Sequence, residues 1–193
     1  MTEAQPPSLT GRRVRLRALH QSDFDFLYQL AADEQVGFRW RTRGLTPAPD
    51  AFLALVWAGV DVQFVIVDQR TERLIGLVSA YGADAHAGHV RLAMMAVPDV
   101  MRTGWIIEAA ILFIDYLFAV MNLRKIYFDV PGFNYDTSLG RLGKWFRTEG
   151  TLKDHNYFGG RHWDQHILAL YREDWVELGP RAAAFTRRGT QQV

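Results

Sequence analysis

The sequence contains no cysteine. This absence excludes disulfide bonds, cysteine nucleophiles and metal sites built on thiolates. Disulfides mark oxidising compartments, so a chain without cysteine is expected to be cytoplasmic. His86 and His89 flank a glycine in an expected loop, without the one-turn helical spacing that is typical of zinc ligands. We therefore expect both histidines to be solvated and no metal to be bound.

Long apolar runs and an excess of one charge are also lacking. The longest apolar stretch, residues 106–120, is interrupted by Glu108 and Asp115 and is too short to span a bilayer. The N-terminal residues carry an acid and two prolines, where a secretory signal has basic and then apolar residues. Lys plus Arg total 22 and Asp plus Glu total 21, which gives a net charge of +1. Neither a membrane nor a nucleic acid is expected as a partner.

Arginines nevertheless gather at two places, residues 12–17 and 39–43. In the first they alternate with apolar residues, which is typical of the solvated face of a strand. In the second they surround Phe38 and Trp40, which also fits a binding mouth for an acidic or phosphate-bearing ligand.

The apolar patterns predict one domain over residues 11–176, with a loose leader at 1–10 and a flexible tail at 177–193. The expected strands cover 12–19, 64–67, 74–80, 89–97 and 125–130, with two more around 159–160; helices are expected after Ser22, up to Trp57, over 103–121 and after Asn134. The strands within 64–80 form a hairpin. The strand–helix–strand unit over 89–130 requires a right-handed parallel crossover. The fold is therefore expected to be α/β or α+β, with a mixed sheet.

The loop of this crossover, residues 100–105, is the most informative place for chemistry. The first turn of a helix leaves backbone N–H groups free and carries positive partial charge, so it binds phosphate readily. Gly104 lets the backbone approach an anion closely, and Arg102 adds charge. Many ordinary connections have the same composition, so the loop alone does not decide between these interpretations.

Four strings in order resemble one family: L-T-G-R-R-V-R-L (9–16) with the helix after it, A-M-M-A-V-P-D-V-M-R-T-G-W-I-I-E-A (93–109), V-P-G-F-N-Y-D-T (130–137) and the closing segment 148–175 with G-R-x-x-D and R-E-x-W. They are similar to the GNAT superfamily of N-acetyltransferases, and within it to the RimJ/RimL-like group. The resemblance implies a GNAT fold with a sheet of about seven strands and about four helices. It also implies transfer of an acetyl or related acyl group from acyl-CoA to a primary amine.

The resemblance assigns cofactor contacts residue by residue. Backbone N–H groups of Met95, Ala96 and Val97 match the family's donors to the thioester oxygen, by the logic of an oxyanion hole. The pyrophosphate and pantetheine contacts match Arg102, Thr103, Gly104, Trp105, Ile106 and Asn134.

Catalytic and acceptor roles each have a structural alternative. Thr137 matches the residue that protonates the leaving sulfur, but it also fits a helix cap. His155 and Tyr157 are candidates for the general base, with Asp154 and Asp164 ordering water, but this segment also fits an exposed turn. Phe38, Trp40 and Arg41 match the acceptor pocket of the family, or the aromatic rings close the edge of the core.

Several positions depart from the family pattern. Of the loop pattern [QR]-x-x-G-x-[GA], the chain keeps the central Gly104, with Met101 and Ile106 at the ends. Arg91 stands where many relatives have a glutamate, and Arg141 where some have a tyrosine. Two hypotheses follow: an N-acyltransferase acting on a small-molecule amine or a protein N-terminus, or a non-catalytic protein that binds acyl-CoA or another ligand. The Asn134 element and the closing hairpin favour the enzyme, and dimers are common in the family, so a homodimer is also expected.

Overall fold

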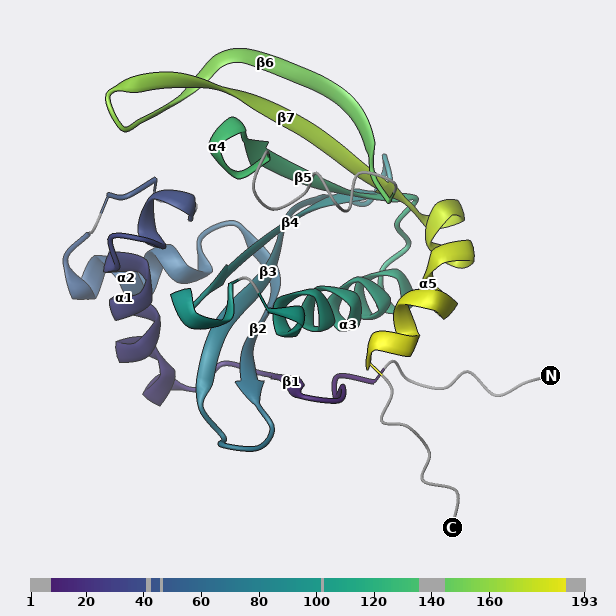
Figure 1. The fold of residues 1–193 in the computed structure, drawn as a ribbon, viewed down its shortest axis with the longest axis horizontal. Helices are drawn as coiled ribbons and strands as arrows, with labels where there is room; N and C mark the ends of the chain where they lie inside the picture. The colour runs from purple at the N-terminus through teal and green to yellow at the C-terminus, as the bar shows by residue number, and fades with distance from the viewer. Residues whose placement is uncertain (1–7, 41–42, 46, 102, 136–144, 187–193) are drawn as a thin grey trace.

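The computed structural model describes residues 8–40, 43–45, 47–101, 103–135 and 145–186. In these residues seven strands form one sheet, and helices pack on both of its faces (Figure 1). The strands are β1 (Val14–Arg17), β2 (Val60–Asp68), β3 (Leu74–Asp84), β4 (His89–Ala96), β5 (Lys125–Pro131), β6 (Arg147–Phe158) and β7 (Arg161–Tyr171). The α-helices are α1 (Phe24–Ala32), α2 (Pro49–Trp57), α3 (Gly104–Val120), α4 (Gly132–Asn134) and α5 (Arg172–Thr186). The α/β fold with a mixed sheet is confirmed.

The strand order is β1-β2-β3-β4-β5-β7-β6. Every neighbouring pair is antiparallel except β4 and β5, which the helix α3 connects in parallel. The β2–β3 hairpin and the parallel crossover are therefore both present as expected. β4 and β5 pair at only three positions, from His89↔Lys125 to Arg91↔Tyr127. Beyond these positions β4 and β5 no longer pair with each other.

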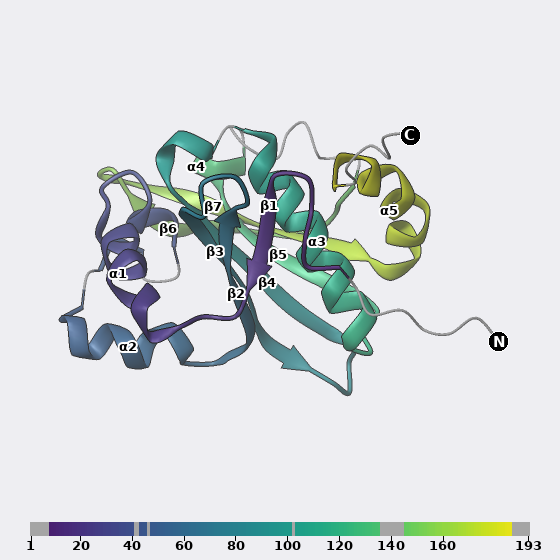
Figure 2. The same ribbon diagram turned by 90° about the horizontal axis from the view of Figure 1, so that it is seen from below.

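Neighbouring residues of β2 show which helices cover which face. The Gln63 side chain donates to the carbonyl oxygen of Val56 in α2, while the Phe64 ring contacts Phe113 of α3 edge-on at 5.9 Å. Since successive side chains of a strand point to opposite faces, α2 and α3 lie on opposite sides of the sheet. Figure 2 shows α1 and α2 together, apart from α3 and α5.

A buried carboxylate ties α3 to the start of β1. Glu108 is 3% exposed, and its Oε1 accepts hydrogen bonds from the backbone N–H groups of Arg12 and Arg13, the latter at 2.9 Å. A Cβ at Gly11 would lie 2.2 Å from the same oxygen, so a side chain there would displace the Glu108 carboxylate. The charged residue in this apolar helix thus has a structural function.

Some local expectations were wrong. Residues 177–186 belong to α5, although a tail was expected from 177. The helix after β1 begins in a 3₁₀ turn at Gln21, where the His20 N–H bonds to Asp23, so Ser22 is not the cap. His89 lies in β4 against the Tyr127 ring and is only partly exposed, so it is not a solvated loop residue. No helix of the described residues is long and apolar enough to cross a membrane.

Candidate functional site

The divergence of β4 from β5 creates the candidate site. β5 leaves β4 after Arg91↔Tyr127, while β4 stays paired with β3 as far as Ala96. At the end of this pairing the Val97 N–H donates to the carbonyl oxygen of Ile75 at 2.9 Å. Because successive N–H groups of a strand point to opposite edges, the Ala96 N–H points toward the edge that β5 has left.

This geometry narrows the expected set of oxyanion donors. The Val97 N–H donates to β3. Met95 lies two residues earlier in the same strand, so its N–H points to the same edge, and both amides face β3. Of the three predicted donors, Ala96 alone faces the opening.

The first turn of α3 follows β4 after a 3₁₀ turn at Pro98–Val100. Thr103 caps the helix: its Oγ1 donates to the Val100 carbonyl oxygen at 2.8 Å and accepts from the Trp105 N–H at 3.3 Å. The N–H groups of Gly104 and Ile106 belong to the first turn of the helix, where backbone N–H groups have no intrahelical acceptor and can bind an anion. An added Cβ at Gly104 would meet nothing within 4 Å, so the turn is open to a ligand.

The loop residues therefore separate by role. Gly104 and Ile106 supply amides at the helix end, whereas Thr103 and the Trp105 amide hold the turn together. Arg102, Arg41 and Thr137 lie outside the described residues, as does Arg141, and their expected roles stay predictions.

An ion pair stands where the opening begins. Arg91 Nε donates to Asp129 Oδ2 at 3.0 Å, and the Asp129 side chain is 18% exposed. Arg91 occupies the place expected for a glutamate, and the structure supplies a carboxylate there from β5 instead. Sequence reasoning missed Asp129, because only the parallel register of β4 and β5 brings it beside Arg91.

Glu149 is a second carboxylate on this part of the sheet, and it is unsuited to proton transfer. Glu149 accepts hydrogen bonds from Lys125 Nζ at 2.7 and 2.8 Å, from the Tyr127 hydroxyl at 2.7 Å and from the Tyr171 hydroxyl. Burial would raise the pKa of Glu149, but the hydrogen bonds from Lys125 and the two tyrosines outweigh it and lower the pKa to about 2. Such a saturated carboxylate stabilises the fold and is a poor base.

An aromatic cluster joins the segment after α1 to the closing hairpin. The rings of Phe38 and Phe158 stack with centroids 3.8 Å apart, and Phe133 lies 5.4 and 5.2 Å from them. Trp163 packs on Phe133 at 5.6 Å. Two guanidinium groups cover the cluster, since Arg39 lies 4.6 Å from the Phe38 centroid and Arg161 3.6 Å from that of Trp163.

Trp40 and Asn134 were also expected near the bound ligands, but neither belongs to the aromatic cluster. Trp40 is only 5% exposed and belongs to the core, as the alternative for it anticipated. Asn134 accepts a hydrogen bond from Arg39, so it joins α4 to the 3₁₀ turn at 37–39. Its contact with pantetheine stays a prediction.

His155 and Tyr157 are not brought to the opening. Both are exposed, and they alternate along β6 with Asn156, which is 8% exposed, and with Phe158, which stacks on Phe38. The two candidate bases therefore occupy the outer face of the hairpin. Asp164 pairs with Lys153 at 2.7 Å and accepts from the Asp154 N–H, so this group of residues is an exposed polar turn.

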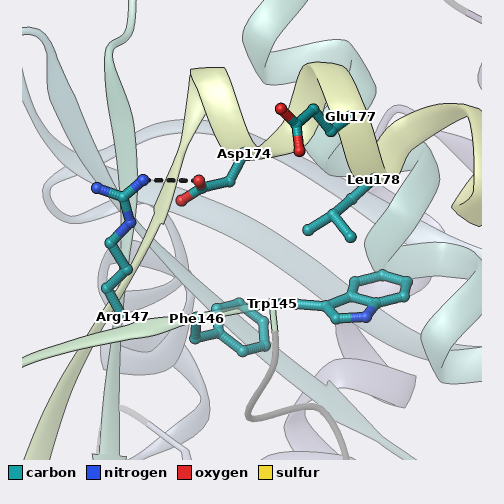
Figure 3. Close-up of a pocket in the computed structure, with 6 residues that line it drawn as sticks. All are labelled: Trp145, Phe146, Arg147, Asp174, Glu177 and Leu178. Atoms are coloured by element: carbon teal, nitrogen blue, oxygen red, sulfur yellow. Dashed lines mark hydrogen bonds and ion pairs between the residues drawn. The ribbon is translucent and has the colours of Figure 1, made fainter.

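A separate pocket of about 210 Å³ lies between β6 and α5 (Figure 3). It is lined by Trp145, Phe146, Arg147, Asp174, Glu177 and Leu178. Tyr171, which precedes α5, pairs with Lys125 at the start of β5, so this pocket is at the sheet end opposite the opening. Arg147 is neutralised by Asp174 at 2.6 Å. Among the residues described, no group of three or more His, Cys, Asp or Glu side chains is arranged to hold a metal ion.

Comparisons with curated proteins and solved structures give weak sequence identity over nearly the full length. The uncharacterized N-acetyltransferase p20 of Bacillus licheniformis is 25% identical over 178 residues, which cover 88% of this chain and 98% of that protein. The uncharacterized N-acetyltransferase YnaD of Bacillus subtilis (strain 168) is 22% identical, covering 86% and 98%. A spermidine N-acetyltransferase from Vibrio cholerae in complex with CoA and spermine superposes with a TM-score of 0.75 at 22% identity, covering 85% of this chain and 98% of that one.

These similarities support the fold, and the RimJ/RimL-like subgroup stays a prediction. The acetyltransferase (GNAT) domain family matches residues 13–136. This segment contains β1 to β5, the α3 turn and most of the opening. Because it covers more than half of the sequence, the chain belongs to the acetyltransferase (GNAT) domain family.

Proposed function

We propose that this protein is an N-acyltransferase that moves an acetyl or related acyl group from acyl-CoA to a primary amine. The transfer is direct, in a ternary complex. The observation that carries the proposal is the opening between β4 and β5, bordered by the Ala96 N–H and by the open first turn of α3.

The residues around the opening supply what amine attack on a thioester requires. The α3 turn binds the pyrophosphate through the amides of Gly104 and Ile106. The Ala96 N–H donates to the thioester oxygen as negative charge develops on it. The amine approaches past Asp129, whose carboxylate orients the ammonium and takes its proton through water. The amine nitrogen bonds to the thioester carbon, the C–S bond breaks, and CoA leaves as its thiolate, which takes up the proton lost from the amine. Close positioning then supplies much of the rate.

The aromatic cluster of Phe38, Phe133, Phe158 and Trp163 is the proposed acceptor region. Its rings favour an amine that carries an apolar or aromatic group, whether a small molecule or a protein N-terminus. Arg39 and Arg161 on these rings disfavour a polycation such as the spermidine of the Vibrio enzyme. A cytoplasmic location and a homodimer remain proposals alongside this function.

The alternative is a non-catalytic protein that binds acyl-CoA. It is favoured by the loop, which keeps only Gly104 of the family pattern. Calorimetric titration with acetyl-CoA and with free CoA is the first test, followed by thiol release with a panel of amines. Micromolar binding with thiol release supports the enzyme. Binding without thiol release with any amine supports the alternative, and no binding of either CoA species contradicts both.

Two variants make the titration specific to the α3 turn. Gly104→Asp places a negative charge among the amides, in space that the fold leaves open, and is expected to abolish CoA binding. Gly104→Asn has nearly the same shape without the charge, so it should retain most of the affinity. Equal loss in both variants would mean that the turn does not bind an anion.

A further inference from the structure

The turn after α1 fixes one more arginine beside the proposed acceptor region. The Arg43 N–H donates to the Trp40 carbonyl oxygen at 3.0 Å. The next N–H, of Gly44, donates to the Gly37 carbonyl oxygen at 3.1 Å. A Cβ on Gly44 would lie 3.7 Å from Phe38, so the turn packs against a member of the aromatic cluster. Backbone hydrogen bonds therefore hold Arg43 next to the rings.

Arg43 adopts a backbone conformation that residues other than glycine seldom take. Its φ is 54°, in the left-handed region. Residues held in such conformations gather at active sites and ligand clamps, where the surrounding structure maintains them. The side chain that this turn orients is therefore a candidate contact for a ligand.

The guanidinium of Arg43 lies near the ion pair of Arg91 and Asp129. Burial of the guanidinium lowers the pKa of Arg43, and the nearby Tyr81 and Asp129 raise it. Within the part of the chain that the structure describes, the Arg43 side chain forms no hydrogen bond or ion pair, while Asp129 is already bound by Arg91 at 3.0 Å. The side chain keeps an exposed surface, so a ligand can reach it. Arg43 thus offers hydrogen-bond donors and a partly desolvated positive charge.

Positive charge dominates around the aromatic cluster and the opening. The guanidinium groups there are those of Arg39 and Arg161 on the rings and of Arg43 and Arg91 beside Asp129. The carboxylate of Asp164, in the adjoining hairpin, is paired with Lys153 at 2.7 Å. Four guanidinium groups facing the carboxylate of Asp129 favour an acceptor that carries a negative charge besides its amine.

We propose that the acceptor is an aromatic amino acid, a primary amine that also carries a carboxylate and an aromatic ring. The ammonium group meets Asp129, the carboxylate accepts paired hydrogen bonds from Arg43, and the ring packs against the aromatic cluster. An α-amino acid holds its two opposite charges close together, as Asp129 and Arg43 are. The inference rests on the proposed acyltransferase function. It separates a free amino acid from a protein N-terminus, in which a neutral amide replaces the carboxylate.

The carboxylate takes no part in the making and breaking of bonds. The α-nitrogen bonds to the acyl carbon and releases two protons, one to water through Asp129 and one to the departing CoA thiolate. The products are the N-acyl amino acid and CoA. The nitrogen of the product is neutral, so its attraction to Asp129 is lost and release is favoured.

The test compares phenylalanine, phenylalaninamide and phenethylamine, which share the ring and the amine and differ in the group beside the amine. Thiol release at saturating acetyl-CoA gives kcat/KM for each. We expect phenylalanine to exceed the other two by about ten- to a hundredfold, the effect of charge-assisted hydrogen bonds. Phenylalaninamide represents a protein N-terminus. A preference for it, or for spermidine, would overturn the proposal.

Variants of Arg43 assign the preference to this side chain. In Arg43→Gln the ratio of kcat/KM between phenylalanine and phenylalaninamide should fall by about ten- to a hundredfold. Arg43→Lys keeps the charge without the planar fork, so the ratio should fall less. The change in ratio does not depend on the basicity of the amines, because each protein is given the same pair.

The control is Arg73→Gln, which removes an exposed guanidinium paired with Asp99 and should keep the ratio. The melting temperature and the Kd of acetyl-CoA, both expected to be unchanged in Arg43→Gln, verify its fold. A ratio that survives in Arg43→Gln would overturn the proposal. Absence of thiol release with every amine would instead remove the proposed function itself, so the two failures are distinguishable.

Discussion

Arg91 Nε donates to Asp129 Oδ2 across 3.0 Å, at the last position where β4 pairs with β5 and beside the opening. The pair places a carboxylate at this position from β5, on the sheet face opposite α3. We propose that Asp129 meets the incoming amine at this position.

Asp129→Asn is expected to lower kcat about a hundredfold, because the amide cannot accept the amine proton. The Kd of acetyl-CoA should be unchanged. Steady-state kinetics and calorimetry measure the two quantities. His155→Gln and Tyr157→Phe are the controls, since both side chains are on the outer face of the hairpin. A large drop in kcat in either control, with normal activity of the Asp129 variant, would indicate that the general base lies in the hairpin.

Ala96→Pro removes the N–H that faces the opening. Proline is tolerated in a strand where its nitrogen is not used in the ladder, so the fold should persist. We expect kcat to fall by about 10²- to 10³-fold, the usual effect of losing one oxyanion donor. Ala96→Ser keeps the amide and should retain activity. Normal turnover in the proline variant would exclude this amide as the donor.

Glu108→Ala is expected to destabilise the protein, because the N–H groups of Arg12 and Arg13, just before β1, lose their partly buried acceptor. Each unsatisfied group costs about 1–3 kcal/mol, and the melting temperature should fall by roughly 2–4 °C per kcal/mol. Glu108→Gln retains an acceptor oxygen and should cost less. Thermal unfolding followed by circular dichroism measures the difference. Equal melting temperatures for the alanine variant and the natural protein would contradict the anchoring role.

The lowered pKa of Glu149 predicts that the stability of the protein depends on pH. Its pKa is about 2 in the folded protein and about 4.5 when unfolded, so the unfolded chain takes up the proton first as the pH falls. The stabilisation is complete above about pH 4.5, is lost toward pH 2, and amounts to about 3 kcal/mol at most. Urea unfolding of the natural protein and Glu149→Gln should differ most near neutral pH and converge in acid. Glu34→Gln, at an exposed position, is the control, and a constant difference would be inconsistent with this linkage.

Phe38→Ala should raise the KM for the acceptor amine with little effect on the Kd of acetyl-CoA, because its ring stacks on Phe158 in the proposed acceptor region. Trp57→Ala, at a half-exposed ring on α2, is the matched control. If the Phe38 variant changed acetyl-CoA affinity instead, the cluster would belong to the cofactor site.

The hydrophobic patterns were sufficient for the strands, the crossover and the start of α3, because these depend on local periodicity and capping. α5 was missed since Gly179 and Pro180 interrupt it; its support is tertiary, with Arg172 donating to carbonyls at the end of α3 and Trp175 to Asp115. The side on which His155 lies follows from an irregularity between Leu152 and Asn156, where Asp154 adopts a φ of 50°. Such a bulge, like the pairing of Asp129, has no local signature.

The short pairing between β4 and β5 divides the sheet into two unequal leaves. One leaf, β1 to β4 with the start of α3, carries the proposed cofactor contacts, and the other, β5 to β7, carries most of the acceptor cluster. The leaves are joined by three β4–β5 residue pairs and the Arg91–Asp129 ion pair, and also by the stacking of Phe38 on Phe158 and the hydrogen bond from Arg39 to Asn134. Backbone pairing between the leaves is therefore short, and side-chain contacts complete the connection. The proposed cofactor and acceptor regions thus lie largely on separate leaves of one sheet.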